Sequence, residues 1–394
     1  MTDKQPQVLI VGAGPVGLTA ALALARAGIT VRVVDSGEDI DRRMRASTFH
    51  PPTLDMLDQL GLGQDLISVG IKVPQWQMRQ HESGQYVTFD LGLISDQTAH
   101  PYRLQVEQHR YCDLAVVALA SYDVSIEFGT GVASLKQDTG GVETVLHNGN
   151  RISAGWVVGA DGAASTVRQS LGLKYGGMTY THSSVLVSTT FPFHEHLEGI
   201  KNVTYCWSER GPFSLLRLRQ LWRASLYPGV EDLTVAAQES RVRDWLAYIC
   251  PPARDASLMD IHPYRVHERC VEQFVVGRVL LAGDAAHLNP PSGGMGMNGG
   301  IHDAMNMADK LTRVIAGEDP TLLKRYDRQR RHVVAKRVIP QASANRQRMA
   351  TKDRPTQLKR LAQQQQMAND PAQCRAFLLR ASMIDGLREA EHIG

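Results

Sequence analysis

A glycine-rich turn between an apolar strand and an apolar helix lies near the start of the chain, and it limits the possible folds more than any other feature. The strand "VLIV" at 8–11 leads into "GAGPVG" at 12–17, and after the helix a second apolar run ends at Asp35. In a GxGxxG turn the first glycine permits the bend, the second lets backbone approach a pyrophosphate, and the third lets helix pack on strand. The helix N-terminus offers free N–H groups to phosphates, and the acid can accept both ribose hydroxyls. The pattern predicts a dinucleotide site formed by Gly12, Gly14, Pro15, Val16, Gly17, Asp35 and Ser36.

A second strand-to-turn motif, "VVGADGAASTVRQSLG", occupies residues 157–172. Asp161 stands in a glycine turn, where its carboxylate can hold a ribose or a backbone amide. Arg168, on the helix that follows, can serve as a charged clamp. The same pattern also suits an Asx-turn that caps the helix, with Ser165 nearby. The motif alone leaves both interpretations open.

A third motif, "VLLAGDAAHLNPPSGGMGMNGG" at 279–300, contains six glycines and two prolines, so much of its backbone is not covered by large side chains. An apolar run ends at Gly283 and Asp284, which leaves the Asp284 carboxylate free for a sugar-like chain. Pro290 and Pro291 fix an extended backbone, and the glycines of 293–296 expose successive N–H groups. Such N–H groups before a helix suit a planar, electron-accepting ring whose reduced form is anionic.

The composition is typical of a soluble globular protein. The 394 residues are 43% hydrophobic and 21% charged, enough for one large domain or two fused ones. No apolar run reaches the roughly 18 residues that span a bilayer, and the N-terminus lacks a signal-peptide layout. We therefore expect a cytoplasmic protein with no membrane contact. The five cysteines form no CxxC pair, so we expect reduced, packed thiols and no metal site.

The order of the predicted elements indicates an α/β fold with a discontinuous nucleotide-binding domain. Helices are expected within 44–70 and 103–120, and strand character returns at 274–284, with helix from about 298. The intervening insert has the β-rich composition and alternating arginines of a largely antiparallel sheet. The expected parts are a Rossmann-like domain at 1–176 and 276–340, a β-sheet substrate domain at 177–275 and a C-terminal helical segment at 341–394.

The chain after residue 321 carries an excess of Lys and Arg, mixed with apolar residues at helical spacing. We expect helices docked on the acidic remainder with a solvated basic face, and they are our candidate for a homodimer interface. No RNP-type, zinc-finger or basic-zipper pattern occurs, so no nucleic-acid partner is expected. The dyads Arg42-Arg43 and Arg330-Arg331 could meet a pyridine nucleotide, but we expect both to be exposed to solvent.

The three motifs, in this order and at these separations, resemble those of the single-component flavin-dependent aromatic hydroxylases, the family of p-hydroxybenzoate hydroxylase. The resemblance covers about residues 6–340 and implies a glutathione-reductase-type FAD-binding domain. It implies that the first motif binds the FAD pyrophosphate, Asp35 the adenosine ribose and Asp284 the ribityl chain. The Asp-Gly motif is associated with FAD and with the nicotinamide cofactor. The further FAD contacts implied are Arg45, Gln105, Asp161, Arg168, Gly283, Gly294, Gly296, Met297 and Asn298.

The resemblance also implies the reaction. NADH or NADPH reduces FAD, O₂ adds to the reduced flavin to give a C4a-hydroperoxide, and an electron-rich, usually phenolic ring takes the distal oxygen. The cofactor does this chemistry, while the protein supplies position, electrostatics and exclusion of water. The candidate catalytic residues are Pro290, whose backbone would frame the flavin, Tyr205, and His287 as a proton relay. A loop-fixing role is the alternative for His287.

The substrate is expected between the flavin and the inner face of the β-rich insert. Arg217, Arg219 and Arg223 alternate with apolar residues and can carry a guanidinium toward a carboxylate, although arginines also suit the wet face of a sheet. Tyr205 and Tyr227 can hydrogen-bond a phenol and favour its ionised form, or can simply pack. Pro291 completes the expected substrate contacts.

Three other functions fit parts of the pattern. An FAD enzyme of the same fold could carry out epoxidation, N-hydroxylation or desaturation. A non-catalytic flavin-binding protein would keep the scaffold, but the intact motifs argue against it. A plain NAD-dependent dehydrogenase is weakened by the two downstream motifs. The leading hypothesis is an NAD(P)H- and O₂-dependent FAD monooxygenase acting on a small phenolic or carboxylic aromatic substrate.

Overall fold

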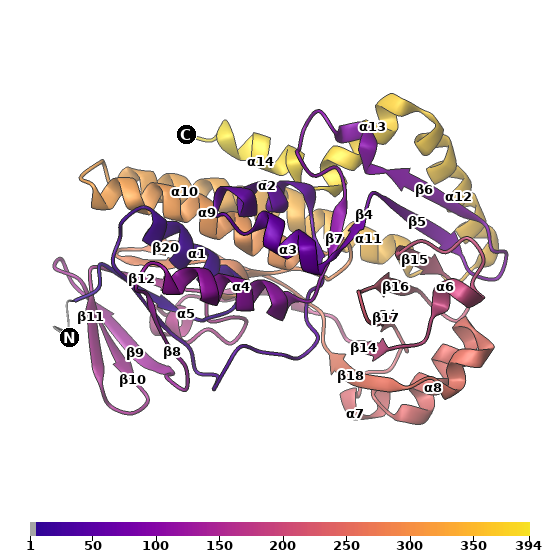
Figure 1. Ribbon diagram of the computed structural model, residues 1–394, viewed down its shortest axis with the longest axis horizontal. Helices are drawn as coiled ribbons and strands as arrows, with labels where there is room; N and C mark the ends of the chain where they lie inside the picture. The colour runs from indigo at the N-terminus through magenta and orange to yellow at the C-terminus, as the bar shows by residue number, and fades with distance from the viewer. Residues whose placement is uncertain (1–4) are drawn as a thin grey trace.

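The computed structural model describes residues 5–394, and a six-stranded sheet forms the centre of its nucleotide-binding part (Figure 1). The strands lie in the order β20-β21-β12-β1-β2-β8. Their bounds are β1 Val8–Val11, β2 Val31–Val34, β8 Ser125–Glu127, β12 Trp156–Gly159, β20 Val275–Val276 and β21 Val279–Leu281. β1 pairs in parallel with both β2 and β12, and all four of its residues are buried. A parallel sheet covered on both faces requires such a continuous apolar run, and it confirms the predicted α/β fold.

Helix α1 (Pro15–Arg26) connects β1 to β2 and packs against α4 (Gln108–Ala120) and α9 (Met295–Ile315). Gly14 is its N-cap and Pro15 its first helical residue, where the missing N–H costs nothing. Its small, buried alanines allow the close approach of α9. The third motif thereby lies beside the first, although almost 300 residues separate them in the sequence.

The second large sheet has seven strands in the order β18-β14-β17-β16-β15-β5-β6 and forms the right-hand part of Figure 1. Five strands come from the predicted β-rich insert: β14 Ser184–Thr189, β15 Val203–Trp207, β16 Phe213–Arg217, β17 Trp222–Leu226 and β18 Leu258–Tyr264. All pairings among these five are antiparallel. Helices α6 (Phe193–His196), α7 (Leu233–Ala236) and α8 (Glu239–Ile249) accompany them.

The other two strands, β5 (Gln75–Gln80) and β6 (Tyr86–Asp90), come from the part of the chain that we assigned to the nucleotide-binding domain. β5 pairs in parallel with β15 and antiparallel with β6. Trp76 stacks on Phe89 at 4.5 Å, and both pack in one apolar cluster with Val203 and Trp207 of β15. This long-range burial joins residues 75–90 to the insert, and no local pattern indicates it.

Three smaller sheets complete the strand architecture. Their strands are β3 (Thr48–Phe49), β4 (Ile71–Val73) and β7 (Arg103–Gln105); β9 (Val132–Gln137), β10 (Val142–Leu146) and β11 (Arg151–Ala154); and β13 (Tyr175–Thr179), β19 (His267–Val271) and β22 (His287–Leu288). The predicted helix over 103–120 is wrong at its start, because β7 pairs with β3 and β4 and α4 begins only at Gln108.

The chain ends in a run of helices that crosses the whole molecule (Figure 1). α10 (Thr321–Val333) leads through a π-helical turn, Val334–Val338, into α11 (Ile339–Met349). α12 (Arg354–Asn369), α13 (Pro371–Ala381) and α14 (Ile384–Glu391) follow. α12 packs on β5 and β6, and α14 returns to α10. The C-terminal helices therefore brace both large sheets.

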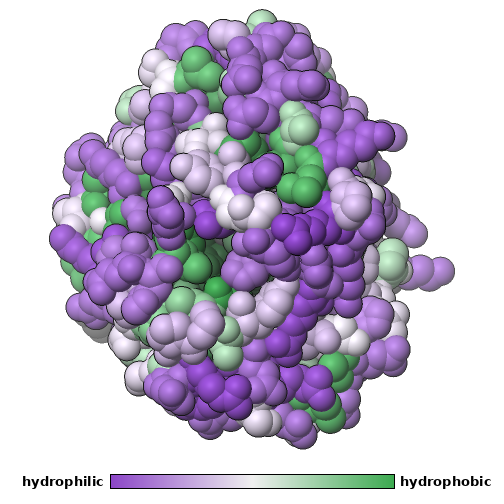
Figure 2. All heavy atoms as spheres, turned by 90° about the vertical axis from the view of Figure 1, so that its right-hand side faces the viewer, coloured by the Kyte–Doolittle hydropathy of each residue, from purple (hydrophilic) through white to green (hydrophobic). Residues whose placement is uncertain are grey.

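The remaining helices are short. They are α2 (Pro51–Gln59), α3 (Gly63–Val69), α5 (Thr166–Ser170) and the 3₁₀ turns Leu91–Ile94, Pro251–Asp255 and Gly283–Ala285. None of the helices in residues 5–394 is both long and apolar enough to cross a membrane. Figure 2 shows a mostly hydrophilic face with small, separate hydrophobic patches. All five cysteines are free and only Cys270 is not fully buried, as the sequence predicted.

Substituting Gly17 by Ala should destabilise the protein. A Cβ there would lie 1.9 Å from the Gly12 carbonyl oxygen, so the contact between α1 and the turn before it would have to open. We expect the free energy of unfolding of the flavin-free protein to fall by about 1–3 kcal/mol, measured by urea denaturation. Gly14→Ala is the matched control, because a Cβ there meets no described atom within 4 Å. Equal stability of the two variants would contradict the packing role of Gly17.

Candidate active site

A cavity of about 1190 Å³ connects the glycine-rich turn of the first motif to the seven-stranded sheet. Residues of all three motifs line it. The predicted site residues on its wall are Gly12, Gly14, Pro15, Val16, Asp35, Ser36, Arg45, Asp161, Asp284, Pro291, Gly294, Gly296, Met297, Tyr205, Arg223 and Tyr227. Gly17, Gln105, Arg168, Gly283, His287, Pro290, Asn298, Arg217 and Arg219 are not part of the lining.

The first-motif end of the cavity has the geometry that a dinucleotide requires. Gly12 has a φ of +110°, and a Cβ there would lie 2.3 Å from the Ala160 carbonyl oxygen, so only glycine fits this turn. The space beside Gly14, at the N-terminus of α1, is open. Asp35 accepts hydrogen bonds from the backbone N–H groups of Ala13 (2.6 Å) and Gly37 (2.7 Å). Each of its oxygens keeps a lone pair for a ribose hydroxyl.

Asp284 lies at the end of β21, and its carboxylate has no hydrogen-bond partner among residues 5–394. Its side chain is exposed on the cavity wall, and desolvation by the surrounding protein raises the pKa of the carboxyl group. The open space beside Gly14, the Asp35 carboxylate and this unpartnered Asp284 carboxylate together fit the pyrophosphate, adenosine ribose and ribityl chain of FAD.

Asp161 and Arg168 organise the backbone around the cavity. Asp161 accepts hydrogen bonds from Ser165 Oγ (2.5 Å) and Val167 N (3.1 Å), which is the helix-capping arrangement that the sequence left open. Arg168 donates to the Ala163 and Ala285 carbonyl oxygens and lies 4.0 Å from the centre of the Tyr175 ring. Its guanidinium therefore ties the second motif to the third from behind the cavity wall.

The turn before α9 is held in place by buried polar contacts. Gly293 and Gly294 both have positive φ values, +106° and +68°, and Gly294 is the N-cap of α9. His50 Nε2 donates to the Gly293 carbonyl oxygen at 2.8 Å, and burial lowers the pKa of His50 to about 3. Asn298 donates to the carbonyl oxygens of Thr48 and Gly294. His50 was not predicted as a site residue, because a histidine before two prolines belongs to no distinctive motif.

Gln105 and the prolines also contribute to this end of the site. Gln105 is fully buried and exchanges hydrogen bonds with Thr48 Oγ1, so it supports the strand that holds the turn. Pro290 is buried behind the loop, while Pro291 faces the cavity. Arg45, on the cavity wall, pairs with Asp41 at 3.2 Å.

The opposite end of the cavity holds arginines and tyrosines. Arg223 on β17 donates from Nη1 to Ser47 Oγ at 2.8 Å, and no ion pair involves it among residues 5–394. Burial lowers the pKa of Arg223, and the neighbouring tyrosines 205, 227 and 264 oppose that shift. Burial likewise raises the pKa of Tyr227, so its hydroxyl stays protonated and can donate. Such a guanidinium, without an acidic partner, can receive an anionic ligand.

Two of the three predicted substrate arginines lie elsewhere. Arg219 is exposed and donates to the Ser68 carbonyl oxygen at 2.9 Å, and Arg217 is half-buried outside the cavity. The cavity lining instead includes Arg103, Arg265, Arg346 and Arg348, which were not among the predicted site residues. Arg103 stands in a segment predicted to be helical, and Arg346 in a basic helix with no distinguishing pattern, so only the tertiary fold indicates them.

Comparisons with known proteins identify the family. A family model described as "FAD binding domain" matches residues 5–342. Para-nitrophenol 4-monooxygenase of Pseudomonas sp. (strain WBC-3) is 33% identical over 98% of this chain and 97% of its own. The chain belongs to the FAD-dependent aromatic monooxygenases. A second relative of this monooxygenase is 6-hydroxy-3-succinoylpyridine 3-monooxygenase HspB of Pseudomonas putida (strain DSM 28022 / S16), 30% identical over 88% of this chain and 89% of its own.

A solved structure agrees with this assignment. The monooxygenase superposes on p-nitrophenol 4-monooxygenase PnpA from Pseudomonas putida DLL-E4 with a TM-score of 0.89 and 30% identity. The match covers 96% of this chain and 98% of that one. The predicted p-hydroxybenzoate hydroxylase-like fold and the flavoprotein class are therefore confirmed.

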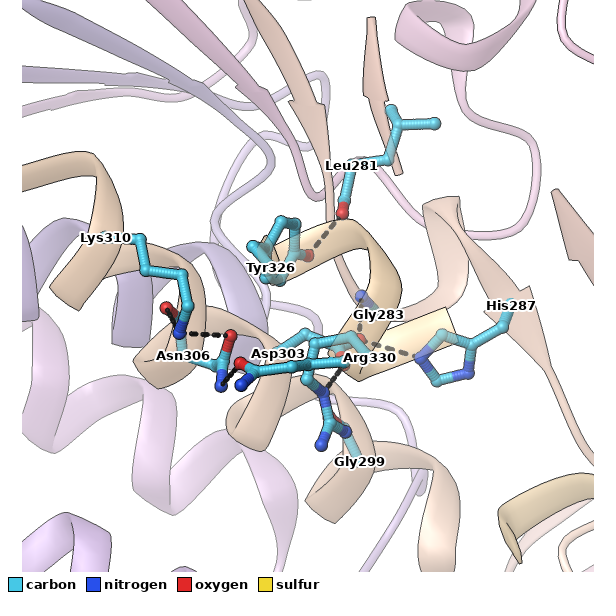
Figure 3. A network of polar contacts seen from close by, with 10 residues as sticks. Leu281, Gly283, His287, Gly299, Asp303, Asn306, Lys310, Tyr326 and Arg330 are labelled. Atoms are coloured by element: carbon cyan, nitrogen blue, oxygen red, sulfur yellow. Dashed lines mark hydrogen bonds and ion pairs between the residues drawn. The ribbon is translucent and has the colours of Figure 1, made fainter. Parts of the chain in front are cut away.

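A buried polar network behind the Gly283–Asp284 turn centres on Asp303 of α9 (Figure 3). Asp303 accepts hydrogen bonds from Arg330 Nε (2.5 Å), His287 Nε2 (2.7 Å) and Gly283 N (3.0 Å), and the side chains of Arg330 and His287 are both buried. Burial alone would raise the pKa of Asp303, but the charge of Arg330 and the hydrogen bonds from Arg330 and His287 outweigh it and hold the pKa well below its usual range. The network fixes the turn that carries Asp284.

This network corrects one expectation from the sequence and bears on another. Arg330 is completely buried, so the expected solvent exposure of the Arg330-Arg331 dyad is wrong for its first residue. Arg42 and Arg43 are exposed, as expected, and pair with Asp113 and Asp41. The structure places His287 in the network, beneath the Gly283–Asp284 turn and outside the cavity lining, which is the loop-fixing position.

Removing Arg330 should cost the monooxygenase much of its stability. Arg330→Met leaves the buried Asp303 carboxylate without its strongest partner, which typically costs about 3–5 kcal/mol. We expect that loss in the free energy of unfolding, together with weaker FAD retention. Arg331→Met is the control, because Arg331 is half-exposed and pairs with Asp327 at 3.2 Å. Equal, small effects of both substitutions would contradict the central role of the network.

Asp284→Asn should separate stability from cofactor binding. The raised pKa means that the folded protein disfavours ionised Asp284, a penalty present above the folded pKa and lost as pH falls below the unfolded one. The flavin-free Asn variant should therefore be more stable than wild type at pH 8, with the difference vanishing toward pH 3. Thermal unfolding across this pH range measures it, and flavin fluorescence should show weaker FAD binding by the variant. Tight FAD binding by Asp284→Asn would contradict the ribityl contact.

Proposed function

We propose that this monooxygenase uses NAD(P)H and O₂ to hydroxylate a small aromatic substrate that carries a phenolic or carboxylic group. The proposal rests on one continuous cavity, which extends from the glycine turn of the first motif to Arg223 on the seven-stranded sheet. The end lined by the three motifs fits FAD. The end at the seven-stranded sheet presents the Arg223 guanidinium, which has no acidic partner among residues 5–394. The names of the two curated relatives describe a nitrophenol and a hydroxypyridine with a succinoyl group, which supports an acidic ring as substrate.

The residues at the end of the cavity lined by the three motifs would position the cofactor. The α1 N-terminus at Gly14 would hold the pyrophosphate, Asp35 the adenosine ribose and Asp284 the ribityl chain. Gly294, Gly296 and Met297, at the start of α9, would lie against the flavin ring. The N-terminus of α9 places its positive dipole there and would stabilise negative charge on a bound ring. When bound, FAD supplies the redox and oxygen-activating chemistry.

The residues at the end of the cavity near the seven-stranded sheet would hold and activate the aromatic ring of the substrate. Arg223 would attract the ring oxygen and favour its ionised form, which is a better nucleophile toward oxygen. Tyr205 and Tyr227, both within electrostatic range of Arg223, would supply hydroxyl groups that can orient the same oxygen. Enclosure of these side chains keeps water away from the reacting atoms.

The proposal can be tested by mixing the holoenzyme with NADH or NADPH in a stopped-flow spectrometer, with a panel of phenols and aromatic carboxylates. We expect one ligand class to accelerate bleaching of the flavin band and to yield a hydroxylated product that contains oxygen from ¹⁸O₂. Bleaching that no ligand accelerates, or a product without the label, would contradict aromatic hydroxylation and favour another oxidation on the same fold.

Arg223→Met should raise the pKa of a phenol bound in the cavity. Bound 4-nitrophenol reports its own ionisation through its absorbance, so the wild-type complex should be in the yellow phenolate form at lower pH than free 4-nitrophenol. Without the guanidinium we expect the apparent pKa of the ligand to rise by about one unit, or about 1.4 kcal/mol. Arg219→Met, outside the cavity, is the control. An unchanged ligand pKa in Arg223→Met would exclude this role.

A further inference from the structure

Three arginines from different elements line the cavity among tyrosines: Arg103 from β7, Arg223 from β17 and Arg346 from α11. The lining also includes Arg265 and Arg348. Arg103 Nη1 donates to Tyr205 OH at 3.3 Å, and the Arg346 guanidinium lies 5.7 Å from the centre of the Tyr227 ring. Both tyrosines lie within electrostatic range of Arg223. We call Arg103, Arg223, Arg346, Tyr205 and Tyr227 the arginine–tyrosine row.

The positive charge of the row is not balanced inside the cavity. The acidic residues on the cavity wall come from the dinucleotide motifs and the segment after β2, and they are Asp35, Asp39, Asp41, Asp161 and Asp284. Among residues 5–394, no ion pair involves the arginines of the row. Glu268 lies close to the Arg346 end, but its carboxylate accepts hydrogen bonds from Tyr180 and Ser343.

Each arginine of the row also has a buried nitrogen without a hydrogen-bond partner: Arg103 Nε, Arg223 Nε and Arg346 Nη1. Arg103 is itself almost completely buried, at 2% exposure. A desolvated cation without an acidic partner costs free energy, and an anionic ligand on the cavity face of its guanidinium lowers that cost. The ring oxygen of the substrate can serve Arg223, in the middle of the row, but Arg346 at its end requires another acceptor.

We propose that Arg346 forms a second anion-binding position, so that the substrate carries an ionised acidic group in addition to its ring hydroxyl. This inference rests on the proposed function, because it assigns a further contact to the same substrate. The ring hydroxyl faces Arg223 and Tyr205, and the acidic group points toward α11. Stacking on Tyr180 at 4.4 Å holds the Arg346 guanidinium at the wall. Arg346 lies beyond residue 342, where the family match ends, so the C-terminal helices of this chain supply the contact.

The test is an equilibrium titration of the oxidised holoenzyme, followed by the flavin absorbance change, with matched pairs of neutral and ionised ligands. The pairs are 4-hydroxybenzoate with 4-hydroxybenzamide, and 4-hydroxyphenylacetate with its amide. We expect wild type to bind at least one acid about tenfold or more tightly than its amide, the value of one charge-assisted hydrogen bond. Arg346→Met should remove this preference by weakening the acid, whereas Arg346→Lys and the control Arg219→Met should retain it.

Three outcomes would overturn the proposal: no acid bound better than its amide by wild type, an unchanged preference in Arg346→Met, or equal weakening of acid and amide in that variant. An anion could also come from the phosphates of a pyridine nucleotide. Arg346→Met would then raise only the NAD(P)H concentration needed for half-maximal flavin reduction and leave the acid preference intact, which overturns the proposal. An Arg346-dependent preference without any hydroxylated product would contradict the proposed function and leave the anion position standing.

Discussion

The carboxylate of Asp303 connects helix α10, His287 and the turn at Gly283, which lie behind one wall of the cavity. It accepts hydrogen bonds from Arg330 on α10, from His287 and from the backbone of Gly283, all inside the protein. Because burial of an unpaired charge is costly, loss of either side-chain partner would destabilise the folded protein. The turn that carries Asp284 and the start of α9 are thereby held at fixed positions on the cavity wall. Arg168 completes the arrangement by linking the same turn to the second motif.

The cavity has opposite charges at its two ends, and this asymmetry agrees with the two molecules it would bind together. Acidic side chains line the end that fits the sugar parts of FAD, where carboxylates accept hydroxyl hydrogen bonds. Arginines and tyrosines line the other end, where an acidic ring would bind. The glycine-rich start of α9 lies at the junction and lets a flat ring approach the backbone. Few side chains need to take part in chemistry, because the cofactor supplies it.

Local patterns in the sequence predicted the backbone-dominated part of the site. The glycines at 12, 14 and 17 and the acids at 35 and 284 lie where the strand–turn–helix pattern predicts them. The substrate end was predicted less well. Of the three candidate arginines, only Arg223 lines the cavity. Arg217 is the last residue of β16, and Arg219 lies beyond the end of that strand. Residue type and alternation cannot tell which face of a strand meets a cavity formed by distant segments.

The sequence by itself determined the fold class and the dinucleotide site, because glycine turns, strand ends and helix starts are local features with a fixed spacing. Only the tertiary structure decided the composition of the substrate end. Strand pairing brought residues 75–90 into the second sheet and placed Arg103 on β7. Packing of α10 on α9 buried Arg330, and the last helices brought Arg346 to the cavity. These positions depend on contacts between residues far apart in the chain, which hydrophobic burial and charge pairing select only when the whole molecule has folded.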